Sequence, residues 1–390
     1  MPYATPASAA VPRTASRTAS TRVPRPARLP GGLVYVNPEM PGLSRQKRGK
    51  AFRYRRHDGE WLRDPDEIAR INMLAIPPAY TQVWICPLVN GHLQATGLDA
   101  RGRKQYRYHA DWRMQRDESK FERLEAFGLA LPRIRARVAR DLVPKKGEPL
   151  GRTVLLATLV RLLDTTYMRV GNEEYASTNG SYGLTTLRMP HAGVRGSVLQ
   201  LRFRGKSGVM QEVQLDDPRV ARVVRRCQQL PGQELFQYQD DDGMPHAVGS
   251  SDVNDYLREI ASGDDGLHFT AKDFRTWHGT VQALELTRLA CGQEGAAAYS
   301  AKHVLAEVAR QLGNTPAVCK KSYIHPAVLA LGGNLGSDVG TGIADIWDRI
   351  AGKSQRQRKL YAAEHRLLAF LQEHRRQPLR ARTAVKKTAA

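Results

Sequence analysis

The sequence contains no long uncharged hydrophobic segment, and its N-terminus lacks the apolar region of a secretory signal peptide. Its most apolar stretch, TVLLATLVRLLDTTYM, is interrupted by Arg161 and Asp164, which favours a core helix over a membrane span. There is also no basic amphipathic segment that would anchor the chain at a membrane surface. We therefore expect a protein with no membrane partner.

Cysteine is scarce and widely spaced. The four cysteines, Cys86, Cys227, Cys291 and Cys319, form no CxxC pair. This spacing argues against a zinc site and against a disulfide framework. It suits the reducing conditions of the cytoplasm, where we expect the protein to reside.

Acidic residues are few for a chain of this length. The 390 residues include 60 Lys and Arg but only 38 Asp and Glu, which gives a formal net charge of +22. Such a charge repels itself unless a polyanion screens it, so nucleic acid is the first partner to expect. With 41% hydrophobic residues, the chain can form two domains and additional tails.

Three common catalytic signatures are missing. The GKS at 205–207 has Gln200 where a phosphate-binding P-loop needs glycine, which argues against an ATP site. No GxSxG motif occurs, so a serine-hydrolase elbow is excluded. The only dense carboxylate run is DDDG at 240–243, and a solvated turn explains it more simply than the metal site of a two-metal nuclease.

The composition divides the chain into four parts. Residues 1–30 are rich in Pro, Ala, Ser, Thr and Arg and have no acid, which predicts a disordered basic arm; residues 375–390 predict a basic tail. Residues 31–110 predict a small β-rich domain with strands in LVYVN, QVWICP and HLQATGLD and one helix near DPDEIARINML. It ends in DARGRKQYRYH, where cations alternate with tyrosines. This run is either a nucleic-acid contact surface or a solvated charged turn.

Residues 111–374 predict a mainly helical domain with one β-hairpin, so the fold class is α+β. Residues 151–170 predict a helix that is apolar on one broad face and stops at Gly171. Alternation on both sides of GKSG predicts a hairpin with Lys206 at its tip. TAKD at 270–273 predicts the start of a second helix, and Thr315 with Pro316 predicts the start of a third.

Four residues then stand out beside glycines or helix starts: Arg169, Lys206, Arg275 and Tyr323. A single tyrosine is most often core filler, but two Arg, a Lys and a Tyr suit phosphodiester cleavage by a tyrosine. The phenol oxygen attacks phosphorus, and planar guanidiniums bind the non-bridging oxygens. The lysine donates a proton to the leaving oxygen.

Seven segments carry a family resemblance, in the family's own order: IPPAYTQVW, GHLQATGLDARGRKQYRYH, RVGNEEY, SYGLTTL, FRGKSG, KDFRTW and LGNTPAVCKKSYIHP. Together they resemble the type IB DNA topoisomerases, specifically the compact poxvirus-like and bacterial group. The resemblance spans roughly residues 30–370. It implies a two-domain clamp around duplex DNA, no metal or other cofactor, a monomer, and a cytoplasmic, nucleoid-associated location.

The same resemblance implies a role for each matching residue. Tyr323 would be the nucleophile that forms a 3′-phosphotyrosyl intermediate and frees a 5′-hydroxyl. Arg169 and Arg275 would stabilise charge on the phosphate, and Lys206 would be the general acid. Many relatives have His where this chain has Asn314, which can donate a hydrogen bond but cannot carry a charge. The implied DNA-contacting residues are Arg103, Lys104, Gln105, Tyr106, Tyr108, Tyr175 and Lys272.

Two alternatives remain open. A site-specific tyrosine recombinase uses a similar Arg-Lys-Arg-Tyr set, but recombinases usually carry His-x-x-Arg where this chain has Lys272 before Arg275. A non-enzymatic nucleoid-binding protein would explain the charge and the tails, but it would not explain the ordered motifs.

Overall fold

The chain divides between Arg116 and Asp117 into two compact units. A computed structural model describes residues 32–49, 51–100, 102–143, 147–261, 268–291, 300–333, 347–350 and 358–376. The predicted arm at 1–30 lies outside these residues, as does the predicted tail except for Arg375 and Arg376, which end helix α12. None of the helices in these ranges is long and apolar enough to cross a membrane.

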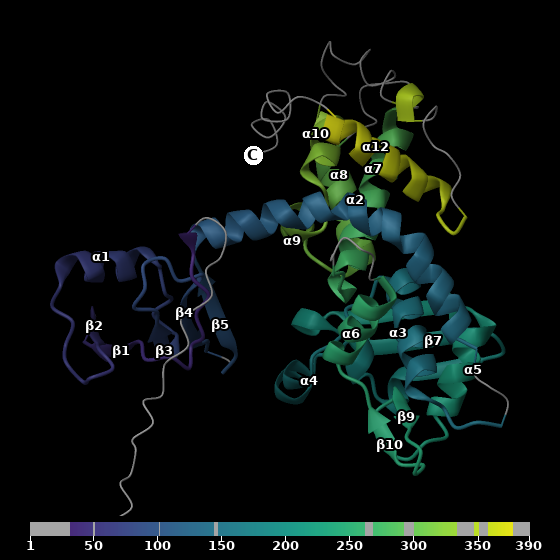
Figure 1. Cartoon of the computed structure of the whole chain (residues 1–390), viewed down its shortest axis with the longest axis horizontal. Coiled ribbons are helices and arrows are strands. Elements are labelled where there is room, and N and C mark those ends of the chain that lie inside the picture. Colours follow the sequence, from purple (N-terminus) through teal and green to yellow (C-terminus); the bar gives the residue numbers. More distant parts are fainter. Residues whose placement is uncertain are drawn as a thin grey trace, which may run out of the picture. The chain divides into compact units, whose positions relative to one another are not determined.

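The first unit is a five-stranded antiparallel sheet in the order β2-β1-β3-β4-β5, with one helix beside it (Figure 1). The elements are β1 (Leu43–Arg48), β2 (Ala51–Arg55), α1 (Pro65–Met73), β3 (Thr81–Ile85), β4 (Leu93–Leu98) and β5 (Lys104–Tyr108). Helix α1 begins after Asp64, whose carboxylate accepts the first free N–H groups. Ile71 of α1 is buried against a core that includes Leu43, Tyr54 and Ile85, so α1 covers one face of the sheet.

The predicted strands in QVWICP and HLQATGLD and the predicted helix are confirmed, but a strand at LVYVN is wrong. Only Val34 of that segment forms a bridge, to Gly91. The next inward-facing N–H, that of Val36, donates to the His92 Nδ1 side-chain atom (3.0 Å) instead of to a strand. The ladder therefore stops after one residue.

The β1–β2 hairpin was not predicted. Its pairing places Arg45 opposite Tyr54 on the core-facing side, where a hydrophobic residue would normally mark a strand. The Arg45 guanidinium lies there because it donates to the carbonyls of Ile76, Pro77 and Tyr80 at 2.7–2.9 Å. The second half of DARGRKQYRYH is likewise a strand, β5, paired with β4. The charged-turn interpretation of that run is therefore wrong beyond Arg103.

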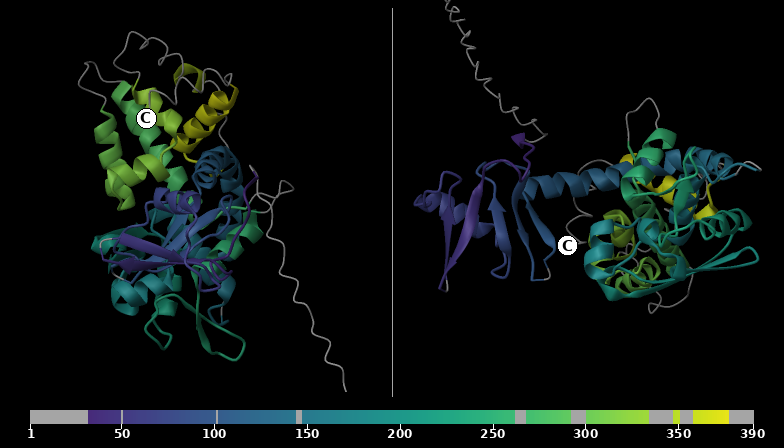
Figure 2. Two further views of the ribbon diagram at one scale, coloured as in Figure 1. Left: turned by 90° about the vertical axis from the view of Figure 1, so that its left-hand side faces the viewer. Right: turned by 90° about the horizontal axis from the view of Figure 1, so that it is seen from below.

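The second unit is mainly helical and carries a small three-stranded sheet, β6-β7-β8. Its helices are α2 (Ala110–Asp141, which contains the boundary), α3 (Arg152–Thr166), α4 (Glu173–Asn179), α5 (Pro218–Cys227), α6 (Ser250–Ala261), α7 (Ala271–Cys291), α8 (Ala301–Leu312), α9 (Pro316–Ser322), α10 (Pro326–Gly333) and α12 (Ala362–Arg376). Its strands are β6 (Ala192–Arg195), β7 (Val198–Arg204), β8 (Met210–Asp216), β9 (Gln237–Gln239) and β10 (Pro245–Ala247), and short 3₁₀ turns cover Leu184–Thr186, Met189–His191 and Lys206–Gly208. Helices α8, α10 and α12 pack against α7 (Figures 1 and 2).

Helix α3 differs from its prediction in both length and environment. It ends at Thr166 because Tyr167 adopts a left-handed conformation (φ 58°), several residues before the predicted stop at Gly171. It is buried on all sides along Leu155–Val160, not on one broad face, since α5, α6 and α7 surround it. Arg169 consequently lies after the helix, in a segment without regular secondary structure.

The other local predictions for this unit are confirmed. Strands β7 and β8 pair from Val198↔Asp216 to Arg204↔Met210, with Lys206 in the turn between them, although β6 was not foreseen. Thr270 N–H donates to Asp273 at the start of α7 (2.7 Å). Thr315 caps α9, with Pro316 as its first residue. The DDDG run is a turn in which Asp240 accepts N–H groups of Asp242 and Met244.

Candidate active site

Arg169 is placed by the backbone of the SYGLTTL segment. The Arg169 carbonyl accepts from Leu184 N–H (2.8 Å), and the neighbouring Val170 carbonyl accepts from Thr185 N–H (2.6 Å). The segments around Gly171 and Gly183 approach closely because glycine faces glycine: a Cβ at position 183 would lie 2.5 Å from the Gly171 Cα. Glycine at this contact therefore fixes where the Arg169 side chain starts.

Arg275 is buried, at 4% exposed, one turn into helix α7. Its Nη1 donates to the carbonyl of Tyr167, and its Nη2 donates to the carbonyl of Leu312 (2.7 Å). Its Nε is buried without an acceptor among the described residues. Carbonyls orient the guanidinium without neutralising it, so its full charge remains available to an anion.

Asn314 lies just after helix α8, where Gly313 takes the left-handed conformation (φ 57°) that ends the helix. Arg169 Nη2 donates to the Gly313 carbonyl (3.0 Å) and to Asn314 Oδ1. This contact fixes the orientation of the amide. Asn314 Nδ2 is buried beside the Cys319 thiol and has no oxygen or nitrogen acceptor in the part of the chain that the structure describes, so it is a second donor available to a ligand.

Tyr323 follows α9 and is supported from behind by α7. The Thr280 hydroxyl shares its proton between the Thr276 carbonyl of its own helix (2.8 Å) and the Tyr323 carbonyl (3.1 Å), and it accepts from His325 N–H (3.2 Å). Gly279 allows the approach, since a Cβ there would lie 3.0 Å from the Tyr323 carbonyl oxygen. The Arg275 guanidinium carbon lies 5.0 Å from the centre of the Tyr323 ring. One helix thus carries an arginine and positions the tyrosine beside it.

The electrostatics of the site favour an anionic phenol. Burial alone would raise the pKa of Tyr323, but the charge and hydrogen bond of Arg275, together with the charges of Arg169 and Lys272, outweigh it. The pKa of Tyr323 therefore lies below its ordinary value of 10.0. Burial and the nearby charge of Arg275 lower the pKa of the Arg169 guanidinium. Two guanidiniums that repel each other at short range form a site for an anion.

Lys206 is not part of this cluster. It is exposed, and among the described residues it makes no hydrogen bond or ion pair with the other four predicted catalytic residues. Its hairpin nevertheless adjoins the site. Tyr182 N–H donates to the Arg204 carbonyl (2.8 Å), and the Gln211 amide packs over Gly313 so closely that a Cβ there would lie 2.7 Å from Gln211 Oε1.

The predicted DNA-contacting residues of the first unit divide into two groups. Arg103 and Gln105 both contact Asp99: Arg103 forms an ion pair with its carboxylate (2.7 Å), and Gln105 donates a hydrogen bond to it (2.9 Å). Lys104, Tyr106 and Tyr108 are exposed on strand β5, and the two tyrosine rings lie parallel with centroids 6.1 Å apart.

In the second unit, Lys272 is exposed in the first turn of α7, one turn before Arg275. The side chain of Tyr175 lies outside the described residues.

The described residues contain no group of three or more His, Cys, Asp or Glu suited to a metal ion. Cys86, Cys227 and Cys319 are buried free thiols, and the Cys291 side chain is not described. The expectation that the chemistry needs no metal or other cofactor stays a prediction.

Three supporting residues were missed from the sequence: Tyr167, Gly279 and Thr280. Their roles depend on backbone carbonyls and close approach between segments far apart in the chain. A weak signal existed for two of them, because Gly279 and Thr280 follow Arg275 by about one helical turn and share its helix.

Comparison with known proteins bears directly on this site. The family model of the eukaryotic DNA topoisomerase I catalytic core matches residues 109–331, and that of the bacterial DNA topoisomerase IB N-terminal domain matches residues 51–99. DNA topoisomerase 1B of Acanthamoeba polyphaga mimivirus is 33% identical over 75% of this chain and 88% of its own length. DNA topoisomerase 1 of Mycosarcoma maydis is 23% identical over 50% of this chain and 19% of its own length.

Proposed function

Since this chain belongs to the type IB DNA topoisomerases, enzymes of the isomerase class, we propose that it relaxes supercoiled duplex DNA by cutting and rejoining one strand through Tyr323. The Tyr323 phenolate attacks the scissile phosphorus and forms a 3′-phosphotyrosyl bond, while the 5′ oxygen leaves. The bond keeps the energy of the broken phosphodiester, so the 5′-hydroxyl can attack it and reseal the strand without ATP.

Charge on the reacting phosphate is stabilised by groups that are already in place. Arg169 and Arg275 are anchored to carbonyls, and each keeps its charge for the non-bridging oxygens. Asn314 adds a neutral donor, Nδ2, whose orientation Arg169 sets through Oδ1. Donors fixed in advance stabilise the transition state without being reorganised during the reaction, and they take over the role that a metal ion plays in other nucleases.

Lys206 protonates the leaving 5′ oxygen. Support comes from its position at the exposed turn of a hairpin whose strand β8 packs on Gly313. From there a flexible four-carbon stem reaches the opposite side of the phosphate from Tyr323, which an in-line displacement requires.

The partner is duplex DNA, and the net charge of +22 favours it. We propose that the protein acts as a monomer that encloses the duplex with both units, associated with the nucleoid. The exposed residues Lys104, Tyr106 and Tyr108 contact DNA from the first unit and Lys272 from the second. Arg103, Gln105 and Tyr175 belong to the same proposed contact set, although Asp99 competes for the first two.

The observation that carries the proposal is the meeting of the half-buried Arg169 and the buried Arg275 at one tyrosine whose pKa they lower. Core tyrosines need no such neighbours. Binding of DNA by charge alone would need neither burial of Arg275 nor support of Tyr323 by Thr280.

The test uses supercoiled plasmid in EDTA without ATP. We expect removal of both positive and negative supercoils, and a denaturant quench should leave protein covalently attached to DNA through a peptide that contains Tyr323. A plasmid without any recombination site serves as substrate, so relaxation also separates this function from that of a recombinase. Strict dependence on ATP or metal, or the absence of a covalent adduct, would refute the proposal.

A further inference from the structure

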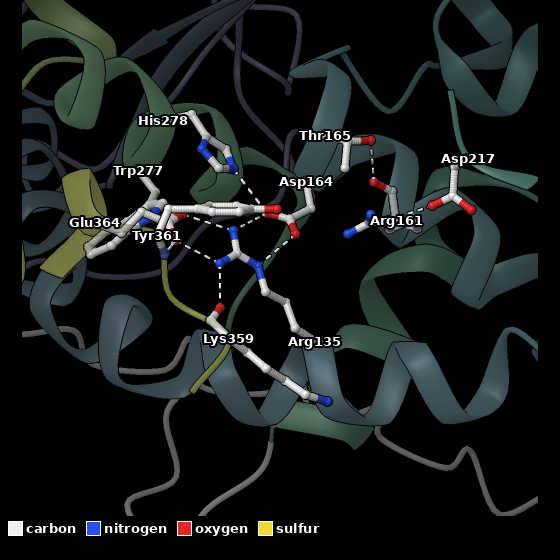
Figure 3. A network of polar contacts seen from close by, with 10 residues as sticks. All are labelled: Arg135, Arg161, Asp164, Thr165, Asp217, Trp277, His278, Lys359, Tyr361 and Glu364. Atoms are coloured by element: carbon white, nitrogen blue, oxygen red, sulfur yellow. Dashed lines mark hydrogen bonds and ion pairs between the residues drawn. The ribbon is translucent and has the colours of Figure 1, made fainter. Parts of the chain in front are cut away.

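A buried network of polar side chains joins helices α2, α3, α7 and α12 (Figure 3). Its centre is Arg135 of helix α2, which donates to Asp164 of α3 through Nε and Nη2 (both 2.8 Å) and to Glu364 of α12 through Nη1 and Nη2 (2.7 and 2.8 Å). Asp164 and Glu364 are 6% and 2% exposed. Burying charges is costly unless they are paired, so this network needs a reason.

The network is hydrogen-bonded to two consecutive residues of helix α7. Trp277 Nε1 donates to Glu364 Oε1 (3.0 Å), and His278 Nε2 lies 3.0 Å from Asp164 Oδ1. These two residues stand between Arg275 and the pair Gly279 and Thr280, which supports Tyr323. The rotation of this helical turn therefore sets both the arginine and the nucleophile.

The network also includes the C-terminal end of helix α3. Asp164 lies in its last turn, shortly before Tyr167 and Arg169. The Tyr167 ring packs on His278, with ring centroids 4.4 Å apart, and the Tyr167 carbonyl accepts from Arg275 Nη1. The Asp164–His278 contact thus joins the two segments from which the two arginines extend.

We propose that Asp164 and His278 are positioning residues that set the spacing of Arg169 and Arg275, with Arg135 and Glu364 holding Asp164 and the neighbouring turn in place. This inference rests on the proposed function and deepens it, because neither residue touches the phosphate. His278 donates from Nε2 to Asp164. Burial opposes ionisation of Asp164, yet the hydrogen bonds from His278 and Arg135 hold its pKa well below the usual range. The acceptor is therefore a carboxylate at any working pH.

The test compares substitutions that remove or keep the donor. His278→Leu keeps the volume but removes the bond to Asp164, whereas His278→Gln places an amide N–H near the same position. We expect single-turnover cleavage of saturated DNA to fall about 10²-fold for Leu, as for a 1 Å misplacement of reacting groups. For Gln, the retained hydrogen bond should keep the rate within about 3-fold of the unsubstituted protein.

A second substrate separates positioning from general structural damage. In a methylphosphonate at the cleavage site, one charged non-bridging oxygen is replaced by a methyl group, so the arginine pair has less charge to stabilise. The deficit of His278→Leu should shrink by about 10-fold or more on this substrate. A protein that has merely lost order would be slowed equally on both substrates.

A control breaks an ion pair between α12 and α7 that lies farther along α7 from Arg275. Arg366 of α12 donates to both carboxylate oxygens of Glu285 of α7 (2.6 and 2.7 Å). Glu285→Gln should lower the unfolding temperature while leaving cleavage of bound DNA unchanged. If His278→Leu does not fold, Asp164→Asn, which keeps the shape, should give the same substrate-selective deficit at about 10-fold.

Unchanged cleavage in a folded His278→Leu, or equal deficits on phosphate and methylphosphonate, would overturn the inference. Failure of the proposed function has a different signature: the unsubstituted protein would form no covalent adduct, or Tyr323→Phe would still form one.

Discussion

The arginine pair and Lys206 carry the same charge, but the protein holds them in opposite ways. Arg275 is buried and Arg169 is half-buried, and each donates to the main chain before any DNA is present. Lys206 is exposed in a tight turn formed by Ser207 (φ 64°) and Gly208 (φ 79°). This difference in burial and bonding suits two different catalytic roles. Charge stabilisation benefits from fixed dipoles and charges, whereas proton donation needs one group to reach one atom at the right moment.

The largest effect is expected when the attacking oxygen of Tyr323 is removed, because both the arginine pair and Lys206 act on the reaction that this oxygen starts. Tyr323→Phe keeps the ring beside Arg275 but lacks the attacking oxygen. Relaxation should vanish, while DNA binding and the unfolding temperature should stay near those of the unsubstituted protein. Gel relaxation assays, filter binding and thermal unfolding would measure these three. Relaxation at a comparable rate would mean that another residue is the nucleophile.

The next largest effects concern the arginines themselves. Arg169→Ala and Arg275→Ala should each slow cleavage about 10²–10³-fold, the usual loss for one transition-state donor. Arg275→Ala should also lower the free energy of unfolding by about 1–3 kcal/mol, because the buried carbonyls of Tyr167 and Leu312 lose their donor.

Lys206→Ala provides the contrast in stability, since an exposed turn residue should change the free energy of unfolding by no more than about 0.5 kcal/mol. Urea unfolding of the three variants checks this. A destabilised Lys206→Ala would show that the lysine has a structural role.

The same contrast explains what the sequence could predict. The Lys206 hairpin and the caps at Thr315 and Asp273 follow from short-range patterns, which alternation and capping residues reveal locally. The family resemblance pointed to Tyr323, Arg169, Arg275 and Asn314, and the structure brings these four together. Their convergence could not be read from local patterns, because it depends on contacts between α3, α7 and the segments after α8 and α9.

The errors have identifiable physical causes. Helix α3 ends early because a tyrosine, Tyr167, adopts a left-handed conformation that favours glycine. Strand β1 was missed because Arg45 occupies a core-facing position, where its guanidinium donates hydrogen bonds to backbone carbonyls. The Asp164–His278 contact joins residues more than 100 positions apart, and no local pattern reports such a pair.

A smaller effect is expected where the support of the nucleophile is weakened without loss of any reacting group. Thr280→Val keeps the shape but removes the hydroxyl that bonds the Tyr323 carbonyl and accepts from His325 N–H. Cleavage of bound DNA should slow about 10-fold, less than the 10²-fold that a full 1 Å displacement can cost. Thr276→Val is the matched control on the same helix, and its rate should stay unchanged. Single-turnover kinetics would decide, and equal rates for both variants would remove the positioning role of Thr280.

The smallest effect is a shift in titration. Ultraviolet difference titration of the free protein against Tyr323→Phe isolates the ionisation of this phenol, and its midpoint should lie below 10.0. In Arg275→Ala the midpoint should rise. Burial raises the pKa of Tyr323, and the charge of Arg275, which is the largest effect that lowers this pKa, is absent from the variant. A midpoint that does not move would mean that Arg275 does not stabilise the phenolate.

The division between charge stabilisation and proton donation is tested most directly with a substrate whose leaving oxygen is replaced by sulfur. A 5′-bridging phosphorothiolate leaves as a thiolate that needs little protonation. Lys206→Ala, slowed about 10²–10⁴-fold on ordinary DNA, should recover on this substrate to within about 10-fold of the unsubstituted protein. Arg169→Ala and Arg275→Ala should stay about 10²-fold slow, since their oxygens are unchanged. Equal rescue of all three variants, or no rescue of Lys206→Ala, would contradict the assignment.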